Sequence, residues 1–363
     1  MTNWSQALAW RMRQQLLDPI GTESVEAVVK RLAAIQASAA ELSIRVRQVQ
    51  SSSGDVDRAV LKGRVIKTFA FRGATHLMTP EDAGIYLALR ASSRMWELPS
   101  WQSFYKLKPS HWPDLRKAVR DALADGPKTK AELKVAVTAH RQFKHLGFAF
   151  SDDAKTLLKP LAWLGEMSFG PPRNGQTTFQ QLDRNPRWTG IPDLDFAGPK
   201  AIENYLRTYG PATAKHLQNW LGANLGAGKL IRSWLASLRD RLALVEIEGA
   251  EAYVLPENLE QLMSMPKTNA VRLLPAYDQW VMGPGTSDAS IVPPDIRPQI
   301  SRGANLVILG GRVSGTWAVG EDTVTIAWSD PRKTPKKQLA EEIERLSTIL
   351  DRRLKLVIEP QQS

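Results

Sequence analysis

The spacing of apolar residues is helical along most of the first 264 residues and changes to that of short strands after Met263–Pro266. Before this point a strand-like segment, Val65–Phe71, follows three helical stretches. After it come short strands, a charged amphipathic helix over Pro335–Arg353 and a closing strand over Leu354–Ile358. The change predicts an α+β protein that ends in a separate, small β-rich domain. The three helical stretches are Trp4–Leu17, Ser24–Ala40 and Asp55–Arg64.

One part of this pattern occurs twice. The dipeptides Gly126-Pro127 and Gly210-Pro211 lie 84 residues apart, and each begins a short helix that is followed by a second helix and a strand–turn–strand pattern. This is the order of a winged helix-turn-helix, which places one helix in the DNA major groove. The alternative is a helix–hairpin unit that only packs against other parts of the chain. The second helices are expected over Asp153–Leu164 and Lys229–Leu238, and the wings over Met167–Phe179 and Ala243–Leu255.

The N-terminal third shows a divergent third copy. Its strand Val65–Phe71 is separated from a second strand, Thr75–Met78, by the turn Arg72-Gly73-Ala74, which predicts another two-stranded wing. We therefore predict tandem winged-helix modules over residues 1–124, 125–198 and 199–265, and the β-rich domain over residues 266–363. The first module contains the candidate catalytic motif described below.

Positive charge is concentrated in this first module. The chain has a net charge of +11, and residues 1–124 hold 18 Lys and Arg against 11 Asp and Glu. A dense cationic cluster attracts phosphates through long-range attraction and counterion release, and a solvated surface that binds nothing is the alternative. We predict that the cluster binds the DNA backbone with little sequence preference. Its members are Arg45, Arg47, Arg58, Lys62, Arg64, Lys67 and Arg72, together with His76.

The composition argues against several other kinds of protein. No stretch of about 18 apolar residues occurs, and Arg11 and Arg13 interrupt the apolar N-terminus, which argues against a secretory signal. The lack of cysteine removes disulfides, thiolate metal sites and cysteine nucleophiles. The histidines show no metal-binding spacing, and Leu225–Lys229 lacks the first glycine and the Ser/Thr of a P-loop. We therefore expect a cytoplasmic protein without a metal or redox cofactor.

An aromatic segment lies at the end of the first module. Residues 96–112 are rich in aromatic side chains and poor in helical pattern, which predicts a linking loop. Trp101, Phe104 and Tyr105 could stack on an extruded base or on an unpaired strand. Packing against a neighbouring domain is the more common use of such residues.

Four further features, spread over nearly the whole chain, carry a resemblance to a known family. They are Arg31–Ser38, Phe71–Leu77, Tyr209–Ala214, and Leu273–Asp278 together with Gly310–Trp317. In this order they resemble the winged-helix family of bacterial DNA glycosylases typified by the azinomycin self-resistance enzyme. The resemblance implies three tandem winged helices, a small C-terminal β-barrel-like domain, and the excision of N-alkylated purines or the unhooking of DNA cross-links.

The same resemblance implies that the catalytic residues are Gln36 and Ser38. The family carries a Gln-x-Gln pair; Gln36 matches its first glutamine, whereas Ser38 stands in place of the second. The helical pattern of Ser24–Ala40 places Gln36 about 20° from Val25, within the apolar stripe. A buried amide there must find partners or line a polar cavity, and a core glutamine bonded to the backbone is the alternative.

Glutamine suits this chemistry because an N7- or N3-alkylated purine is cationic and is already a good leaving group. The enzyme needs only to hold a water molecule against the developing sugar cation. Gln36 could orient this water through its amide oxygen, and Ser38 could do so through its hydroxyl, although serine is shorter. The nearby carboxylates of Glu41, Asp55 and Asp57 could stabilise the cation, or could simply be solvated.

We therefore predict a bacterial, nucleoid-associated DNA glycosylase that acts on double-stranded DNA as a monomer, because three modules in one chain can curve around DNA. In this arrangement the Arg72–His76 turn lies near the centre of a concave basic surface, and Gln36 lies in a groove. Two alternatives stay open. One is a non-catalytic DNA-binding or lesion-sensing protein in which Ser38 marks lost chemistry, and the other is a transcription regulator, which would dimerise on a palindrome.

Overall fold

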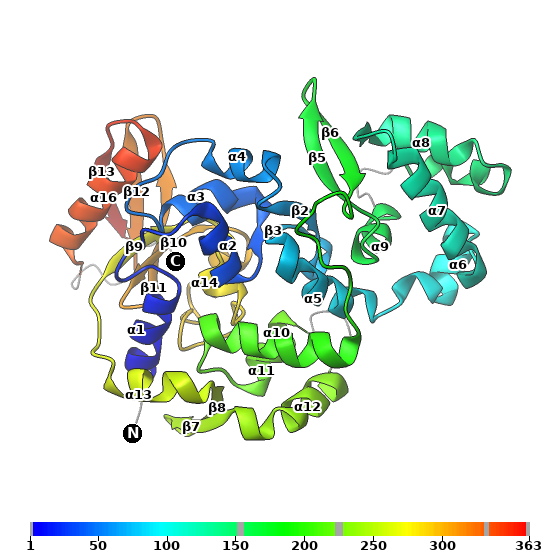
Figure 1. The fold of residues 1–363 in the computed structure, drawn as a ribbon. Coiled ribbons are helices and arrows are strands. Elements are labelled where there is room, and N and C mark those ends of the chain that lie inside the picture. The colour runs from blue at the N-terminus through cyan, green and yellow to red at the C-terminus, as the bar shows by residue number, and fades with distance from the viewer. Residues whose placement is uncertain (1–2, 151–155, 222–227, 330–333, 361–363) are drawn as a thin grey trace. The chain divides into compact units, whose positions relative to one another are not determined.

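The computed structural model describes residues 3–150, 156–221, 228–329 and 334–360 (Figure 1). The chain forms two compact units. The first consists of Met1–Val56, Ile202–Trp220 and Leu230–Ser363, and the second of Asp57–Ala201 and Leu221–Lys229. Both contain helices and strands, as expected of an α+β protein. The predicted boundaries of the four domains stay predictions, because the two units are defined by how compactly their residues pack and not by repeated modules.

The C-terminal β-rich part is an open five-stranded sheet in the first unit (Figure 1). Its strand order is β13-β12-β11-β10-β9, in which β12 and β13 are parallel and the other neighbours are antiparallel. β9 and β13 form the two edges, so the expectation of a barrel-like domain was wrong for the described residues. The strands are β9 (Val271–Leu274), β10 (Asn305–Leu309), β11 (Arg312–Val319), β12 (Thr323–Trp328) and β13 (Lys355–Pro360).

The helix α16 (Lys336–Leu350) covers one face of this sheet. Its apolar residues Leu339, Ile343 and Leu346 recur at helical spacing and pack against alternate strand residues such as Val324. Because α16 also joins the parallel strands β12 and β13, helix and sheet form two layers instead of a closed barrel. The helix predicted over Pro335–Arg353 and the strand after it are confirmed in type and place.

The helix α1 (Trp4–Gln14) is buried on two sides. Asn3 caps its first turn by accepting a hydrogen bond from the backbone N–H of Gln6. Leu8 packs in the core on the second face of the sheet, whereas Trp10 packs in a separate core with the last wing and α13 (Pro256–Ser264). The remaining short helices of this part are α14 (Gln279–Met282) and α15 (Arg297–Ser301).

The helix predicted over Ser24–Ala40 was wrong in its second half. α2 (Val25–Leu32) ends where Ala33 adopts a left-handed φ of 66°. The chain then forms a two-residue strand β1 (Ile35–Gln36), a 3-10 turn η1 (Ala37–Ala39) and α3 (Ala40–Arg45). The helix stops because side chains from another helix donate hydrogen bonds to the carbonyl oxygens of its last turn. In a longer helix these oxygens would accept backbone N–H groups instead.

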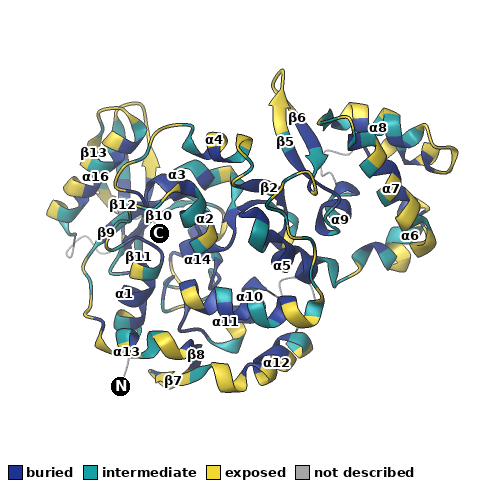
Figure 2. Cartoon of the chain, viewed as in Figure 1, coloured by how far each residue is buried: buried dark blue, intermediate teal, exposed yellow. Residues whose placement is uncertain are grey.

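The second unit contains the two wings predicted before residue 182. β2 (Ile66–Phe69) pairs with β3 (Thr75–Met78), and β4 (Lys128–Thr129) joins β5 (Met167–Arg173) and β6 (Gln176–Gln181) in the order β4-β6-β5. Figure 2 shows the exposed tip of the β5–β6 hairpin. The helices of this unit are α4 (Asp55–Leu61, which begins in the first unit), α5 (Pro80–Ala91), α6 (Pro99–Tyr105), α7 (Trp112–Leu123), α8 (Lys130–Thr138) and α9 (Leu158–Trp163), with 3-10 turns η3 (Met95–Glu97), η4 (Pro109–His111) and η5 (Arg141–Phe148).

The structure revises two of the predictions made from the sequence for this unit. Residues 96–112 were expected to form a loop, but they contain α6, because Pro99 sits in the first turn of a helix, where its missing N–H costs no hydrogen bond. The helix expected over Asp153–Leu164 is described from Leu158, as α9; its first residues lie outside the described ranges.

The last predicted winged module has the expected elements. α10 (Leu194–Tyr209) precedes α11 (Ala214–Trp220) and α12 (Gly228–Ser237), a 3-10 turn η6 (Arg239–Arg241) follows, and β7 (Ala243–Ile247) pairs with β8 (Ala250–Val254). The isolated bridge between Ala212 and Tyr253 adds a third extended segment to this hairpin. Among the helices that the structure describes, none has the length and the apolar character needed to cross a membrane.

Candidate active site and its supports

Gln36 lies in extended backbone and not on a helical face. It is half-buried between the buried Ile35 and the exposed Ser38. Its φ of −61° and ψ of 125° are those of extended chain. Within the described residues its amide group makes no hydrogen bond to protein, so both amide ends are available to a ligand or to water. The interpretation as an enclosed core glutamine therefore finds no support in the local structure.

The segment before Gln36 is fixed by the end of α10. The hydroxyl of Thr208 donates a hydrogen bond to the carbonyl oxygen of Arg31. The hydroxyl of Tyr209 donates to the carbonyl oxygen of Leu32 at 2.8 Å. Tyr209 is fully buried and stacks on Tyr205, with ring centroids 4.8 Å apart. These two hydroxyls end α2 and set the direction in which the chain continues to Gln36.

The segment after Ser38 is fixed by a buried ion pair. Arg47 donates from both terminal nitrogens to the carboxylate of Asp278, at 2.6 and 2.8 Å, and both side chains are fully buried. Ser43, in α3, donates its hydroxyl to the same carboxylate at 2.7 Å. The carboxylate also caps α14, because Oδ1 accepts the backbone N–H of Trp280 at 2.8 Å. One acid thus anchors the helix that follows the candidate catalytic residues.

Trp280, the residue whose N–H caps onto Asp278, also connects this region to the five-stranded sheet. Its indole N–H donates to the carbonyl oxygen of Gly311 at 2.9 Å. Gly311 has a φ of 87°, and a Cβ there would lie 2.8 Å from Leu8 and 3.1 Å from Trp280, so only glycine fits. Trp317 donates in the same way to the carbonyl oxygen of Leu274. The segments Leu273–Asp278 and Gly310–Trp317, which carry the family resemblance, are therefore scaffold for the loop of Gln36.

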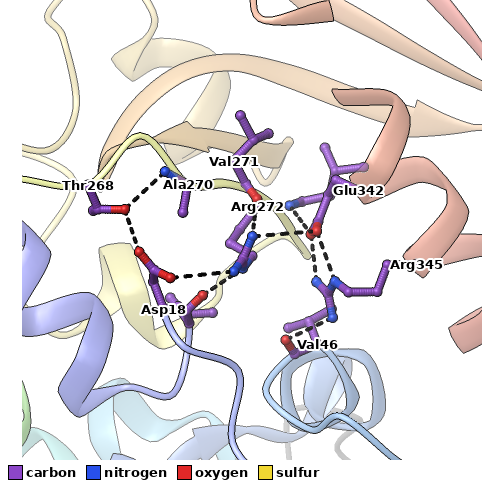
Figure 3. A network of polar contacts seen from close by, with 10 residues as sticks. Asp18, Val46, Thr268, Ala270, Val271, Arg272, Glu342 and Arg345 are labelled. Atoms are coloured by element: carbon purple, nitrogen blue, oxygen red, sulfur yellow. Dashed lines mark hydrogen bonds and ion pairs between the residues drawn. The ribbon is translucent and has the colours of Figure 1, made fainter. Parts of the chain in front are cut away.

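A charged network ties α16 to the same region (Figure 3). Arg345 donates to the carbonyl oxygen of Val46, next to Arg47, at 3.1 Å and pairs with Glu342 at 2.6 Å. Glu342 accepts the backbone N–H of Leu273, in β9, at 3.0 Å. Arg272 lies 3.8 Å from Glu342 and 4.0 Å from Asp18, which follows α1. Ion pairing and backbone hydrogen bonds together satisfy the buried carboxylate of Glu342.

The residues predicted to contact DNA fall into three groups by burial. Arg58, Lys62, Arg64 and Arg72 are exposed. Lys67 is half-buried, with its ammonium group 5.5 Å from the centroid of the Phe169 ring, so it has an internal partner.

The other three residues of this set are buried. Arg47 is committed to Asp278, and Arg45 is 8% exposed and donates to the hydroxyl of Ser51 at 3.1 Å. His76 is 6% exposed, and burial together with the cations Arg72 and Arg90 lowers its pKa to about 4. It is therefore neutral near pH 7 and offers no charge to a phosphate. The sequence could not separate these residues from the exposed ones, because burial in a basic segment leaves no signal in composition.

Arg72 lies in the turn between β2 and β3. It adopts a left-handed φ of 54°, which is unfavourable for a residue with a side chain, and it is followed by Gly73 at φ 69°. The strained backbone holds this turn in one conformation. The role of Arg72 as a DNA contact stays a prediction.

The nearby carboxylates have local roles. Glu41 accepts the backbone N–H of Gly54 at 3.0 Å, and Asp55 accepts that of Ser52 at 2.7 Å. Both therefore hold the turn at residues 51–54. Asp57 is exposed and belongs to the second unit.

The supporting residues Thr208, Tyr209 and Asp278 were not identified from the sequence as neighbours of Gln36. Their hydrogen bonds join positions that are 177 to 235 residues apart, as in Tyr209 to Leu32 and Ser43 to Asp278. One available signal was Asp278 itself, an acid two residues before the apolar run Trp280–Met282, where the N-cap of a helix is expected.

The chain is similar to known proteins over most of its length. A family model described as DNA glycosylase AlkZ-like matches residues 29–349. A protein of Streptomyces sahachiroi named interstrand DNA cross-link repair glycosylase is 34% identical over 352 residues, which cover 94% of each chain. The solved structure of Streptomyces sahachiroi DNA glycosylase AlkZ is similar with a TM-score of 0.94 at 33% identity, over 99% of this chain and 100% of that one.

Proposed function

The chain belongs to the AlkZ-like family of DNA glycosylases, and from this premise we propose that it removes N-alkylated purines and unhooks interstrand cross-links in double-stranded DNA. The observation that carries the proposal is Gln36, whose amide has no partner in the part of the chain that the structure describes and which lies between two buried anchors. The relative from Streptomyces sahachiroi, which is named for cross-link repair, supports the choice of lesion.

The proposed reaction is hydrolysis. A water oxygen forms a bond to C1′ of the sugar while the bond from C1′ to the purine nitrogen breaks, and its electron pair neutralises the cationic base. The water loses its proton to solvent. The amide oxygen of Gln36 accepts a hydrogen bond from this water and holds it against the sugar cation, which is a positioning effect on the transition state. Ser38, two residues further on, is exposed, and its hydroxyl is the second candidate for holding this water, although serine is shorter than the glutamine of the family.

The order of elements supports the three winged-helix modules over residues 1–124, 125–198 and 199–265. In the middle module β4, α8, α9, β5 and β6 follow one another in the winged-helix order, directly after α7, which ends before residue 125. In the last module α11, α12, β7 and β8 follow α10, which begins at Leu194. We propose Arg58, Lys62, Arg64 and Arg72 as backbone contacts, since all four are exposed. The concave surface joining Arg72 and Gln36 stays a prediction, because they belong to different units. A monomer at the nucleoid fits three modules in one chain.

Ser38 favours one alternative function. If the position has lost its chemistry, the protein is a lesion-sensing relative that binds alkylated DNA without cleaving it. A transcription regulator is the less supported alternative, because it would need a dimer to read a palindrome.

The test is incubation of the purified protein with duplex DNA that contains N7-methylguanine, and with a duplex carrying a purine cross-link, followed by heat cleavage at abasic sites. Base release from the first and strand separation in the second support the proposal. Binding without base release from either substrate would favour the lesion sensor.

A further inference from the structure

A second surface with chemistry suited to DNA lies in the second unit, on elements that the proposed active site does not use. It is formed by the end of α6 and by η5, and we call it the aromatic–lysine surface. The rings of Phe104 and Phe148 meet edge to face with centroids 5.7 Å apart, and Phe148 is stacked along Tyr105 at 6.1 Å and 12°. The surface comprises Phe104, Tyr105, Lys106, Lys144 and Phe148.

The rings are held in place but are not covered. Tyr105 is 5% exposed, whereas Phe104 is 64% and Phe148 is 50% exposed. His145 bonds through Nε2 to the carbonyl oxygen of Tyr105 at 3.1 Å, which fixes η5 to α6. A contiguous exposed apolar patch can mark an interaction site, and the two exposed rings of Phe104 and Phe148 are in contact with each other.

The chain around these rings is cationic. Residues 98–113 and 133–150 contain no Asp or Glu, and they hold five Lys and Arg. Lys106 directly follows Tyr105 and ends α6 in a left-handed conformation. The side chain of Lys134 lies 3.5 Å from the position that a Cβ on Gly147 would take, next to Phe148. The five cations are Lys106, Lys108, Lys134, Arg141 and Lys144.

The acids that flank these segments are already engaged where the structure describes them. Glu97 pairs with Arg94, and Glu132 pairs with Arg173. Asp114 accepts a hydrogen bond from Gln142 at 3.4 Å. Asp152 and Asp153 lie outside the described residues. The surface therefore presents aromatic rings to a partner in a positive setting, which complements a polyanion with exposed apolar faces.

We propose that the aromatic–lysine surface binds an unpaired stretch of DNA, with bases stacked on Phe104 and Phe148 and phosphates beside Lys106 and Lys144. Aromatic rings stack on bases without sequence preference, and lysines follow the backbone of a single strand. A duplex hides the faces of its bases, so the exposed rings favour a strand that is unpaired. This inference rests on DNA as the substrate, and it assigns to the protein a second contact with DNA that is separate from base release.

The test is fluorescence anisotropy of a labelled oligothymidylate about 15 nucleotides long, a length within the range that single-strand-binding surfaces occupy. Wild-type protein binds it with salt-dependent affinity. Phe104→Ala and Phe148→Ala each weaken binding about tenfold or more, as expected for loss of one stacked base. Phe104→Tyr and Phe148→Tyr retain the ring and retain binding, which separates stacking from folding.

Phe196→Ala is the matched control. Phe196 is 60% exposed in the same unit, but it is preceded in the sequence by Asp193 and Asp195, and its loss leaves the affinity unchanged. Absence of wild-type binding, or equal losses from Phe196→Ala and Phe104→Ala, overturns the inference. So does self-association that is lost with Phe104→Ala while oligothymidylate binding persists. Gln36→Ala is expected to bind oligothymidylate as the wild type does. If the wild type binds oligothymidylate but releases no base, the proposed function fails and the inference about this surface stands.

Discussion

The hydroxyl of Tyr209 donates a hydrogen bond of 2.8 Å to the carbonyl oxygen of Leu32, across 177 positions of the sequence. Through this hydrogen bond the end of α10 closes the last turn of α2 and sends the chain into the extended segment that carries Gln36. Tyr209, which has no chemical role itself, therefore positions the segment that carries Gln36.

Tyr209→Phe removes only this hydroxyl, and we expect it to lower the free energy of unfolding by about 1 kcal/mol. Because the segment before Gln36 loses an anchor, we also expect a several-fold fall in the rate constant of base release at saturating enzyme, with DNA affinity unchanged. Denaturant unfolding measures the first quantity, and single-turnover kinetics on N7-methylguanine DNA measure the rate constant and the affinity.

Tyr205→Phe is the matched control for this change. Tyr205 is as deeply buried, and its hydroxyl donates to the carbonyl oxygen of Gly283 at 3.2 Å, away from α2. A similar loss of stability with an unchanged rate is expected. Equal losses of rate in the two variants would show that Tyr209 acts only through general stability.

Gln36→Ala should abolish base release while DNA affinity stays within about twofold, because only positioning in the transition state is removed. If Ser38 shares the water, Ser38→Ala should be strongly impaired as well. If Ser38 is a degraded position, the natural protein should be slow and Ser38→Gln should be faster. Activity that survives Gln36→Ala would exclude Gln36 as the catalytic residue.

Asp278→Ala leaves the buried charge of Arg47 without a partner, so we expect the free energy of unfolding to fall by about 3–5 kcal/mol. Denaturant unfolding measures this loss. The double variant Arg47→Met, Asp278→Leu should recover much of it, since no buried charge remains. Glu97→Ala breaks the exposed pair with Arg94 and should cost under about 1 kcal/mol. A loss of DNA affinity from Arg47→Met without loss of stability would contradict the structural role of Arg47.

Reversal of Lys62 and Arg64 to glutamate should weaken binding to undamaged duplex DNA regardless of its sequence. The slope of log affinity against log salt should become shallower by about 0.9 for each phosphate that the protein no longer neutralises. The same change at Lys336 and Lys337, which are exposed on α16, should have less effect. Anisotropy titrations at several salt concentrations measure the affinity for duplex DNA of both double variants. Equal losses of affinity would contradict the prediction that Lys62 and Arg64 contribute more to DNA binding than Lys336 and Lys337 do.

Burial lowers the pKa of His76 from 6.5 to about 4, so the folded protein favours the neutral ring. Stability from this group is fully present above pH 6.5 and is lost as the pH falls from 6.5 towards 4, because the unfolded chain takes up the proton first. A shift of this size corresponds to about 3 kcal/mol. His76→Gln should flatten the pH dependence of unfolding in this range. An unchanged pH profile in His76→Gln would show that another group carries the effect.

The sequence predicted elements well where local pattern decides them. The amphipathic helix at Pro335–Arg353 and the wings at Met167–Phe179 and Ala243–Leu255 all formed, because alternation and turn residues are local properties. The failure at Ser24–Ala40 has a non-local cause. Its apolar spacing continues past Leu32, but Thr208 and Tyr209 take the carbonyl oxygens of the last turn. The open sheet was missed because the local pattern of the strands does not specify whether the edge strands β9 and β13 pair with each other.

The candidate site was predicted in part. Gln36 and Ser38 were identified through the motif, but the helical spacing placed Gln36 on the wrong kind of backbone. Among the cations, Lys62 and Arg64 are exposed, whereas Arg47 is an internal partner of Asp278. No local feature of the sequence distinguishes these cases, because the partner of Arg47 lies 231 positions away.

The bond from Arg345 to the carbonyl oxygen of Val46 spans 299 positions. During translation, the segment of Gln36 leaves the ribosome long before α16 exists, so it cannot take its final form until nearly all of the chain has been made. A chain that ends before α16 would lack one of the anchors that position the segment of Gln36. The support of the candidate catalytic residue is therefore complete only when α16 has been synthesised.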